Sequence, residues 1–382
     1  MKKSYLTFRT LSTLVDHADD WNRILPEKHH LRAEQLLPLE LSALSDLTFL
    51  YLICYSHDEP VAIAYFQYVH FKTRHYPFPL SRNIFTRSIE KFIMRNGYRI
   101  LVCGNLFRVD FPGIFMQEGK VSASVVFEAI EQFFNEVRPK PHVLLLKDWK
   151  EMSTPEQVGS YGYKPWPGDL TMKLDLRPEW VTFHDYSLAL KHKYAQRLRK
   201  IQASGSSICR KELQLEDIVR HGPELETLYC NVVKKQVIRL VIANWQYFME
   251  MKKARGNDFR VIGYYEHEKL IGLSSHIIYD ELWELHYIGM DYSKNEKYAL
   301  YFNMMFDGIR MAIEEKKKAV ELGRTAREAK AMIGAQPIYF QSYFRLKGWL
   351  VNFLVDRFAS VFNEKAGSSW QYRQPFRKGF RN

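Results

Sequence analysis

The feature that most constrains the fold is a strand–turn–strand pattern that occurs twice, 210 positions apart. Residues 49–71, FLYLICYSHDEPVAIAYFQYVHF, and 259–280, FRVIGYYEHEKLIGLSSHIIYD, each place a polar turn between two apolar runs. The matched pairs are Tyr55 with Tyr265, His57 with His267, Asp58 with Glu268, Val61 with Ile271 and Ala62 with Gly272. Hairpins of this kind are common, so a repeat needs a second observation.

A helix, a short apolar strand and a glycine follow the hairpin in both halves. Residues 88–105, SIEKFIMRNGYRILVCGN, reach Gly104, and residues 307–324, DGIRMAIEEKKKAVELGR, reach Gly323. Both halves thus show the same order of elements after the hairpin. This order predicts two similar α/β domains, which suits a chain of 382 residues.

The domain boundary is expected in residues 162–180, GYKPWPGDLTMKLDLRPEW, because prolines and a glycine interrupt the chain there. We therefore expect domains at 1–175 and 176–382. The second should open with a basic helix and continue as a mixed sheet with helices. Its expected strands are 206–213, 259–266, 270–279, 282–290, 318–323 and 336–344, and its expected helices are 215–236, 244–255, 296–315 and 325–333.

Composition limits the binding partners and the cell compartment that we expect for the protein. Lys and Arg number 55 against 43 Asp and Glu, and this net charge of +12 favours polyanions without choosing among nucleic acid, lipid and cofactor phosphates. The four cysteines form no C-x-x-C pair, and the longest apolar run, 49–55, is too short to span a bilayer. We expect a cytoplasmic protein without stable membrane insertion. No His or Cys cluster has metal-ligand spacing, so no metal site is expected.

The order of elements resembles the GNAT acyltransferases, specifically the tandem-domain branch with the Fem-type peptidyltransferases and CelD-like acetyltransferases. The residues that carry the resemblance are KHKYAQRLRK with Lys193 and Arg197, the meander 259–290, and ELGRTAREAKAMIGA with Gly323, Arg324 and Lys330. The resemblance implies two tandem GNAT-like domains, each a mixed, mainly antiparallel sheet flanked by helices. It also implies a catalytic C-terminal domain beside a degenerate N-terminal one.

GNAT chemistry, as the resemblance implies it, is direct attack of an amine on a thioester held where two strands splay. The strand 282–291, LWELHYIGMD, would hold the acyl carbonyl. Period-two alternation places Glu284 and His286 on one face and Tyr287 on the other. Glu284, His286 and Tyr287 are the catalytic candidates. The alternative is that Glu284 or His286 is a cross-strand partner, for example of His276.

The candidate site for a cofactor follows this strand. The usual loop Q/R-x-x-G-x-G/A is missing, since residues 290–305 read MDYSKNEKYALYFNMM. A helix beginning near Glu296, capped by Ser293 or Asn295, would still offer backbone N–H groups to a pyrophosphate. The cofactor-binding candidates are Tyr292, Ser293, Lys294, Asn295 and Lys297. An ordinary capped amphipathic helix is the alternative.

Basic residues near the sheet edge are the candidates for binding an anionic group of donor or acceptor. Arg197 comes from the basic helix, while Arg324 and Lys330 follow Gly323. A structural pairing of Arg324 and Lys330 with Glu321 or Glu328 is the alternative.

The resulting hypothesis is an N-acyltransferase that uses acetyl-CoA or another acyl-CoA. The alternatives are a Fem-like transferase that takes an aminoacyl group from tRNA, and a non-catalytic binding protein on the same fold. The acceptor is a small-molecule or cell-envelope-precursor amine. Residues 345–362 predict an amphipathic helix of the core or of a homodimer, followed by a basic tail.

Overall fold

The computed structural model describes residues 6–72, 97–149, 155–166, 170–235, 241–346 and 373–380. The chain forms two compact units, each described below by itself. The first unit comprises Met1–Asp169, Val237–Val241 and Phe340–Ser368, and the second comprises Leu170–Gln236, Ile242–Tyr339 and Ser369–Asn382. The predicted helix and strand that begin at residue 88 and the predicted C-terminal helix lie wholly or partly outside the described residues.

The first unit is built on a mixed sheet with the order β1-β2-β3-β4-β6-β15-β7, and β5 pairs with β3. Its strands are β1 (Thr7–Leu11), β2 (Leu47–Ser56), β3 (Glu59–Phe71), β4 (Tyr98–Cys103), β5 (Ile114–Met116), β6 (Val143–Leu146), β7 (Lys164–Trp166) and β15 (Ser342–Leu346). Its helices are α1 (Ala18–Asn22), α2 (Ala33–Leu41), α4 (Ala123–Glu136) and α5 (Pro155–Ser160). The apolar face of α4 packs on the sheet, where Phe133 and Phe134 contact Phe66.

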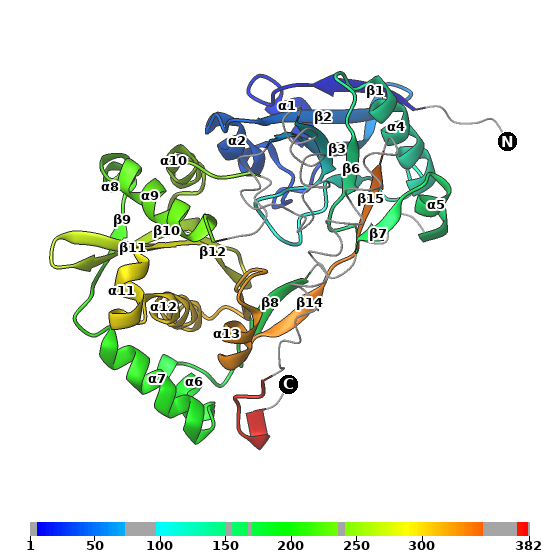
Figure 1. The fold of residues 1–382 in the computed structure, drawn as a ribbon. Coiled ribbons are helices and arrows are strands. Elements are labelled where there is room, and N and C mark those ends of the chain that lie inside the picture. The colour runs from blue at the N-terminus through cyan, green and yellow to red at the C-terminus, as the bar shows by residue number, and fades with distance from the viewer. Residues whose placement is uncertain are drawn as a thin grey trace, which may run out of the picture. The chain divides into compact units, whose positions relative to one another are not determined.

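The second unit has a sheet with the order β14-β8-β13-β12-β11-β10-β9 (Figure 1). Its strands are β8 (Leu170–Asp175), β9 (Cys209–Leu213), β10 (Phe259–Glu266), β11 (Lys269–Ile278), β12 (Leu282–Met290), β13 (Ala319–Glu321) and β14 (Gln336–Tyr339). Its helices are α6 (Phe183–Ala189), α7 (His192–Ser204), α8 (Leu215–Arg220), α9 (Gly222–Val233), α10 (Trp245–Arg255), α11 (Tyr292–Tyr298), α12 (Leu300–Glu314) and α13 (Arg327–Met332). The predicted fold class is confirmed.

Helices cover both faces of the second sheet. Figure 1 shows α9 and α10 on one side of β10–β12, and α11 and α12 on the other. Glycines permit this close approach: a side-chain carbon at Gly289 would stand 2.6 Å from the backbone nitrogen of Tyr229 in α9. One at Gly272 would stand 2.4 Å from Met304 in α12. The helices therefore fix β12 from both sides.

The two sheets repeat one plan with an exchanged strand. Numbered from β1 in the first sheet and from β9 in the second, strands at the same position correspond. The first four positions hold β1–β4 and β9–β12, and the fifth position holds β6 or β13. The sixth place is filled by β15 in the first sheet and by β8 in the second. The predicted strand 336–344 is therefore two strands, β14 and β15, that belong to different sheets.

The hairpin repeat is confirmed at the level of single residues. Both hairpins carry a register shift at matching positions, between Cys54 and Tyr55 and between Tyr264 and Tyr265. The second match, at 88–105 and 307–324, pairs strands that are not equivalent. β4 holds the place of β12, and the place of β13 belongs to β6. A strand followed by a glycine occurs many times in α/β folds, so this pattern alone could not show which strands of the two units are equivalent.

Two predicted helices are each divided. The helix at 215–236 is α8 and α9, which meet at His221 before Gly222 and Pro223. The helix at 296–315 begins earlier, at Tyr292, and is divided into α11 and α12 at Ala299, whose φ of 46° is left-handed. None of the helices in the described ranges is both long enough and apolar enough to cross a membrane.

Candidate functional site

The site of interest is the place where β12 and β13 part. The two strands pair in parallel only from Leu282–Glu284 to Ala319–Glu321. β12 then continues to Met290, whereas β13 ends and the chain turns at Gly323, whose φ is 82°. A turn with positive φ favours glycine, because any side chain is strained there. Beyond Glu284, β12 therefore has no ladder partner in β13.

A β-bulge lies two residues beyond Glu284, the last residue of β12 that pairs with β13. Leu285 lies opposite His276 and Tyr287 opposite Ser275, so His286 is the extra residue of the bulge. Tyr287 donates its backbone N–H to Ser275 Oγ at 3.0 Å. The expected alternation of faces is wrong here, because the bulge brings the rings of His286 and Tyr287 together, with centroids 4.1 Å apart.

The side chains at the bulge form a hydrogen-bonded chain. His286 Nδ1 lies 2.7 Å from Glu284 Oε1, and Tyr247 Oη lies 2.8 Å from His286 Nε2. A carboxylate only accepts, so Nδ1 donates to Glu284 and Nε2 accepts from the tyrosine. Tyr279 donates to Glu284 Oε2 at 3.3 Å. This chain fixes the orientation of the imidazole.

The exposed part of His286 is its backbone. Its side chain is 1% exposed and that of Glu284 6% exposed, while His286 as a whole residue is half-buried. The bulge therefore presents peptide groups at the surface and keeps the imidazole inside. A peptide N–H in such a position is suited to holding a carbonyl oxygen.

The alternative partner His276 belongs to another network. It lies opposite Leu285 and is fully buried, and its Nδ1 accepts from Trp283 Nε1 at 2.9 Å. Its Nε2 lies 2.8 Å from Ser274 Oγ. Burial lowers the pKa of His276 to about 3, with Arg260 and His286 adding to the effect, so this imidazole is neutral. The proposed pairing of Glu284 or His286 with His276 is wrong.

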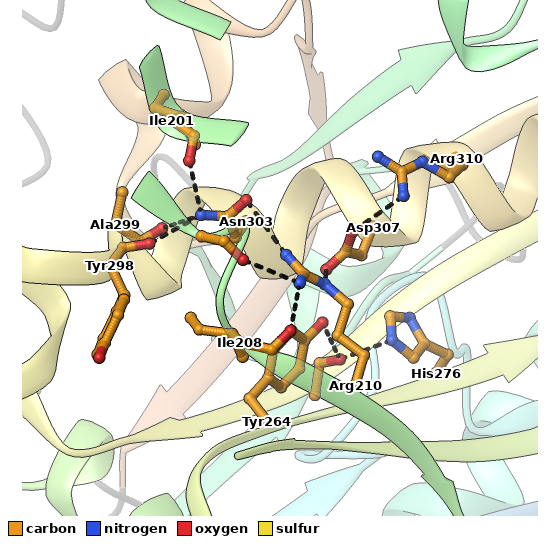
Figure 2. Close-up of polar contacts among 12 residues, drawn as sticks. Ile201, Ile208, Arg210, Tyr264, His276, Tyr298, Ala299, Asn303, Asp307 and Arg310 are labelled. Carbon is orange, nitrogen blue, oxygen red and sulfur yellow. Dashed lines mark hydrogen bonds and ion pairs between the residues drawn. The ribbon is translucent and has the colours of Figure 1, made fainter. Parts of the chain in front are cut away.

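This second network anchors α12 behind the sheet (Figure 2). Arg210 of β9 donates to Asp307 at 2.7 Å and to the carbonyls of Gly205 and Ile208. Asn303 donates to the carbonyls of Ile201 and Tyr298. Such satisfied buried polar groups hold a helix in a single position. The network joins α7, β9 and α12, and its role is structural.

Glu321 and Lys330 are buried beside the parting. Glu321 Oε1 accepts from Gly323 N at 2.6 Å and from the Thr171 hydroxyl. Burial, together with the negative charge of Glu284, raises the pKa of Glu321 to about 7. Burial lowers the pKa of Lys330 to about 8. The sequence indicated Glu321 only as a structural partner for Arg324 or Lys330. A lone glutamate in the apolar run AVEL was the available signal.

The other anion-binding candidates occupy different surroundings. Arg197 stacks over Phe302 of α12, with its guanidinium carbon 4.9 Å from the ring centre. α12 packs against the apolar face of the sheet, which lies opposite the Glu284 face. Arg324 is half-buried directly after Gly323. The alternative partner Glu328 pairs instead with Arg373 at 2.8 Å.

The cofactor candidates lie around a helix start that is already capped. α11 begins at Tyr292, and Asp291 accepts from the backbone N–H of Ser293 at 2.9 Å. The expected cap by Ser293 is therefore wrong. Asn295 instead accepts from Tyr301 N at 3.0 Å, in the first turn of α12. The aromatic ring of Tyr292 packs under Lys235 Nζ.

Glu266 neutralises the lysines of the same stretch. Lys294 Nζ lies 2.5 Å and Lys297 Nζ 3.2 Å from its carboxylate. Hydrogen bonds from Lys294, Tyr298 and Lys297 lower the pKa of Glu266 to about 2. With Asp291 at the cap, the charges of the two lysines are offset. In the described ranges, no group of three or more His, Cys, Asp and Glu could hold a metal ion.

Comparison with known proteins identifies the fold. No protein-family model matches the sequence, and no curated protein matches it. The structure is similar to that of FemX, with 7% identity, 91% of this chain and 100% of that chain covered, and a TM-score of 0.51. It is equally similar to a tandem GNAT protein from the clavulanic acid biosynthesis pathway, with 11% identity, 90% and 99% coverage and a TM-score of 0.51.

A third similar structure is the C-terminal domain of a putative lysylphosphatidylglycerol synthetase from Agrobacterium fabrum. It shows 9% identity, 92% and 98% coverage and a TM-score of 0.50. At these identities the likeness concerns the fold alone. The chain has the tandem GNAT fold, as the resemblance implied.

Proposed function

We propose that the second unit transfers an acyl group from an activated carbonyl donor to an amine. The observation that carries the proposal is the bulge at His286, which exposes backbone beyond the end of the pairing between β12 and β13. A fixed N–H group there would stabilise the negative charge that develops on the acyl oxygen. Glu284, His286 and Tyr287 would be the catalytic groups that position the amine beside it. The tandem GNAT fold supports this reaction class.

For the donor, acetyl-CoA or another acyl-CoA is our first candidate. Its pyrophosphate would lie near Tyr292, Ser293, Lys294, Asn295 and Lys297. An aminoacyl-tRNA is the second candidate, and one observation favours it. Lys294 and Lys297 are both engaged by Glu266, which leaves little positive charge for a pyrophosphate. The net charge of +12 fits a polyanionic donor as well.

For the acceptor, we propose an amine of a small molecule or of a cell-envelope precursor. Of the candidates Arg197, Arg324 and Lys330, Arg324 would bind its anionic part, because Arg197 lies with α12 on the other face of the sheet and Lys330 is buried. We also propose that the two predicted domains have different roles. Residues 176–382 would carry the reaction, while 1–175 would be a degenerate copy.

Ligand-induced stabilisation tests the donor. A ligand at about 100 times its dissociation constant adds about 2.7 kcal/mol to the free energy of unfolding. We expect acetyl-CoA or total aminoacylated tRNA to raise the melting temperature by several degrees, with ATP as the control anion. Transfer of radiolabelled acetyl or aminoacyl groups to a panel of primary amines should follow. If neither donor stabilises the protein or reacts, the proposed function is wrong.

A further inference from the structure

Two carboxylates lie opposite each other at the last paired position before β12 and β13 part. Glu284 is in register with Glu321, so both side chains leave the same face, on strands about 4.8 Å apart. Both residues are buried, with 5% and 8% of their surface exposed. Two like charges so close inside a protein repel each other, so they persist only where protons or cations offset them.

The first unit shows that the fold does not need these charges. The equivalent pairs, taken from the two registers, are Phe66 with His276, Cys103 with Leu285, Val102 with Glu284 and Leu145 with Glu321. Val102 lies opposite Leu145 where the second unit has two glutamates. The sheet packs with an apolar pair at this position in the first unit. Packing therefore does not explain why the second unit has two carboxylates there.

The two carboxylates have different partners. Both oxygens of Glu284 are engaged, one by His286 and one by Tyr279, and His286 is engaged on both nitrogens. Glu321 uses Oε1 for both of its hydrogen bonds, from Thr171 and Gly323. Among the described residues, none donates to Glu321 Oε2. A proton can thus add at Oε2 without breaking an existing hydrogen bond.

Lys330 supplies the nearby positive charge. It comes from α13, is 4% exposed, and its Nζ reaches the Gly323 corner, 3.5 Å from where a side-chain carbon of that glycine would stand. Its charge stabilises the ionised form of Glu321, while burial and Glu284 oppose that form. These opposing effects bring the titration of Glu321 close to neutral pH, where a proton acceptor works best.

We propose that Glu321 is the catalytic proton acceptor of the site, with Lys330 as its positioning residue. This inference rests on the proposed function. A proton leaves the acceptor ammonium and forms an O–H bond at Glu321 Oε2, and the freed nitrogen lone pair forms the C–N bond. As the bond from the acyl carbon to sulfur or oxygen breaks, that proton passes to the leaving group, and the amide nitrogen releases its remaining extra proton to solvent. Glu321 ends the cycle ionised, as it began.

The first test is the variant Glu321→Gln, which keeps an oxygen for Thr171 and Gly323 but cannot take the proton. With the donor that reacts with the wild type, kcat/KM at pH 8 should fall at least about 100-fold. The rise of the wild-type rate around pH 7 should disappear. Glu321→Asp should restore part of the rate. Glu281→Gln, an exposed carboxylate at the start of β12 whose side chain is 65% exposed, is the matched control and should change neither.

A second measurement detects the proton itself. Because the pKa of Glu321 is raised from 4.5 to about 7, the folded protein holds a proton that the unfolded chain releases between those values. The melting temperature of the wild type should therefore fall, relative to Glu321→Gln, as pH rises from about 4.5 to 7, and the difference should then level off. This readout needs no substrate.

The outcomes separate the two proposals. An active wild type whose rate and pH profile survive in Glu321→Gln overturns the role of Glu321 and leaves the proposed function standing. A melting-temperature difference that does not vary with pH also overturns it. A wild type that uses neither donor overturns the proposed function, and this inference with it. Lys330→Met should move the pH profile, and an unchanged profile rejects its positioning role.

Discussion

The two units differ at one equivalent position of their sheets. In the second unit, the pair His286–Tyr287 joins the two halves of β12. In the first unit, the whole segment 104–113 stands between β4 and β5, which pair with successive parts of β3. One sheet thus carries a bulge where the other carries a loop. The shared fold determines where residues can be inserted between the strands. The number of inserted residues determines whether a bulge or a loop forms there.

The inserted segment is firmly packed in the first unit. Phe111 is 1% exposed, and its backbone N–H donates to Asp148 at 3.0 Å. Lys147 donates to the carbonyl of Arg108 at 2.9 Å. Gly113 lies so close to Gly104 that a side-chain carbon on it would stand 2.4 Å from the Gly104 nitrogen. The position that carries the polar side chains and exposed backbone of the bulge in the second unit thus carries a loop with a buried aromatic ring in the first unit.

Removing the buried ring should have the largest effect on stability. Phe111→Ala should lower the free energy of unfolding of the first unit by about 3–5 kcal/mol, because it leaves a cavity under the loop. Urea unfolding followed by tryptophan fluorescence measures it. Phe115→Ala, a half-buried ring in β5, is the control with a smaller expected loss. Equal losses in the two variants would mean that Phe111 does not hold the loop.

The glutamates can be replaced by the residues of the first unit. Glu284→Val with Glu321→Leu should reduce acyl transfer at least about 100-fold, or about 2.7 kcal/mol of transition-state stabilisation. The same variant should gain stability over the wild type, and more at pH 8 than at pH 5, since a raised carboxyl pKa costs stability once the group ionises. Denaturation at both pH values and a transfer assay test this. Retained activity would contradict the assignment of the site to the second unit.

The hydrogen bond that orients His286 can be removed alone. Tyr247→Phe takes away the hydroxyl that His286 Nε2 accepts. We expect a loss of about 1–2 kcal/mol of stability, because a buried acceptor loses its donor. We also expect kcat to fall with little change in KM. A change confined to KM would show that this contact serves binding only.

The smallest effect is expected at the lysines of α11. Lys294→Ala should cost at most about 0.5 kcal/mol of stability, because its ion pair with Glu266 is near the surface. The Lys294→Ala variant is useful mainly for identifying the acyl donor. If acyl-CoA is bound there, the melting shift with acetyl-CoA should shrink, whereas Lys269→Ala on the same unit should leave it unchanged. An undiminished shift would exclude Lys294 from the CoA site.

The sequence predicts what is local and periodic. The hairpins, their turns and the order of β10, β11 and β12 follow from alternation and turn residues. The bulge does not, since ELHY reads as regular alternation whether or not His286 pairs. The break at Ala299 carries neither glycine nor proline. Glu321 acquires its properties from Glu284, which is 37 positions away in the chain and becomes a neighbour only through parallel pairing.

The exchanged strands also set an order for folding during synthesis. β7 pairs only with β15 in the described part of the sheet, and β15 joins β6 through four residue pairs. Because β15 begins at Ser342, the first sheet lacks an inner strand until most of the polypeptide has left the ribosome. The second sheet, whose early strand β8 precedes its other members, can close before that. Neither unit is complete until the last part of the chain has been made, because the core of the second unit also includes Phe376.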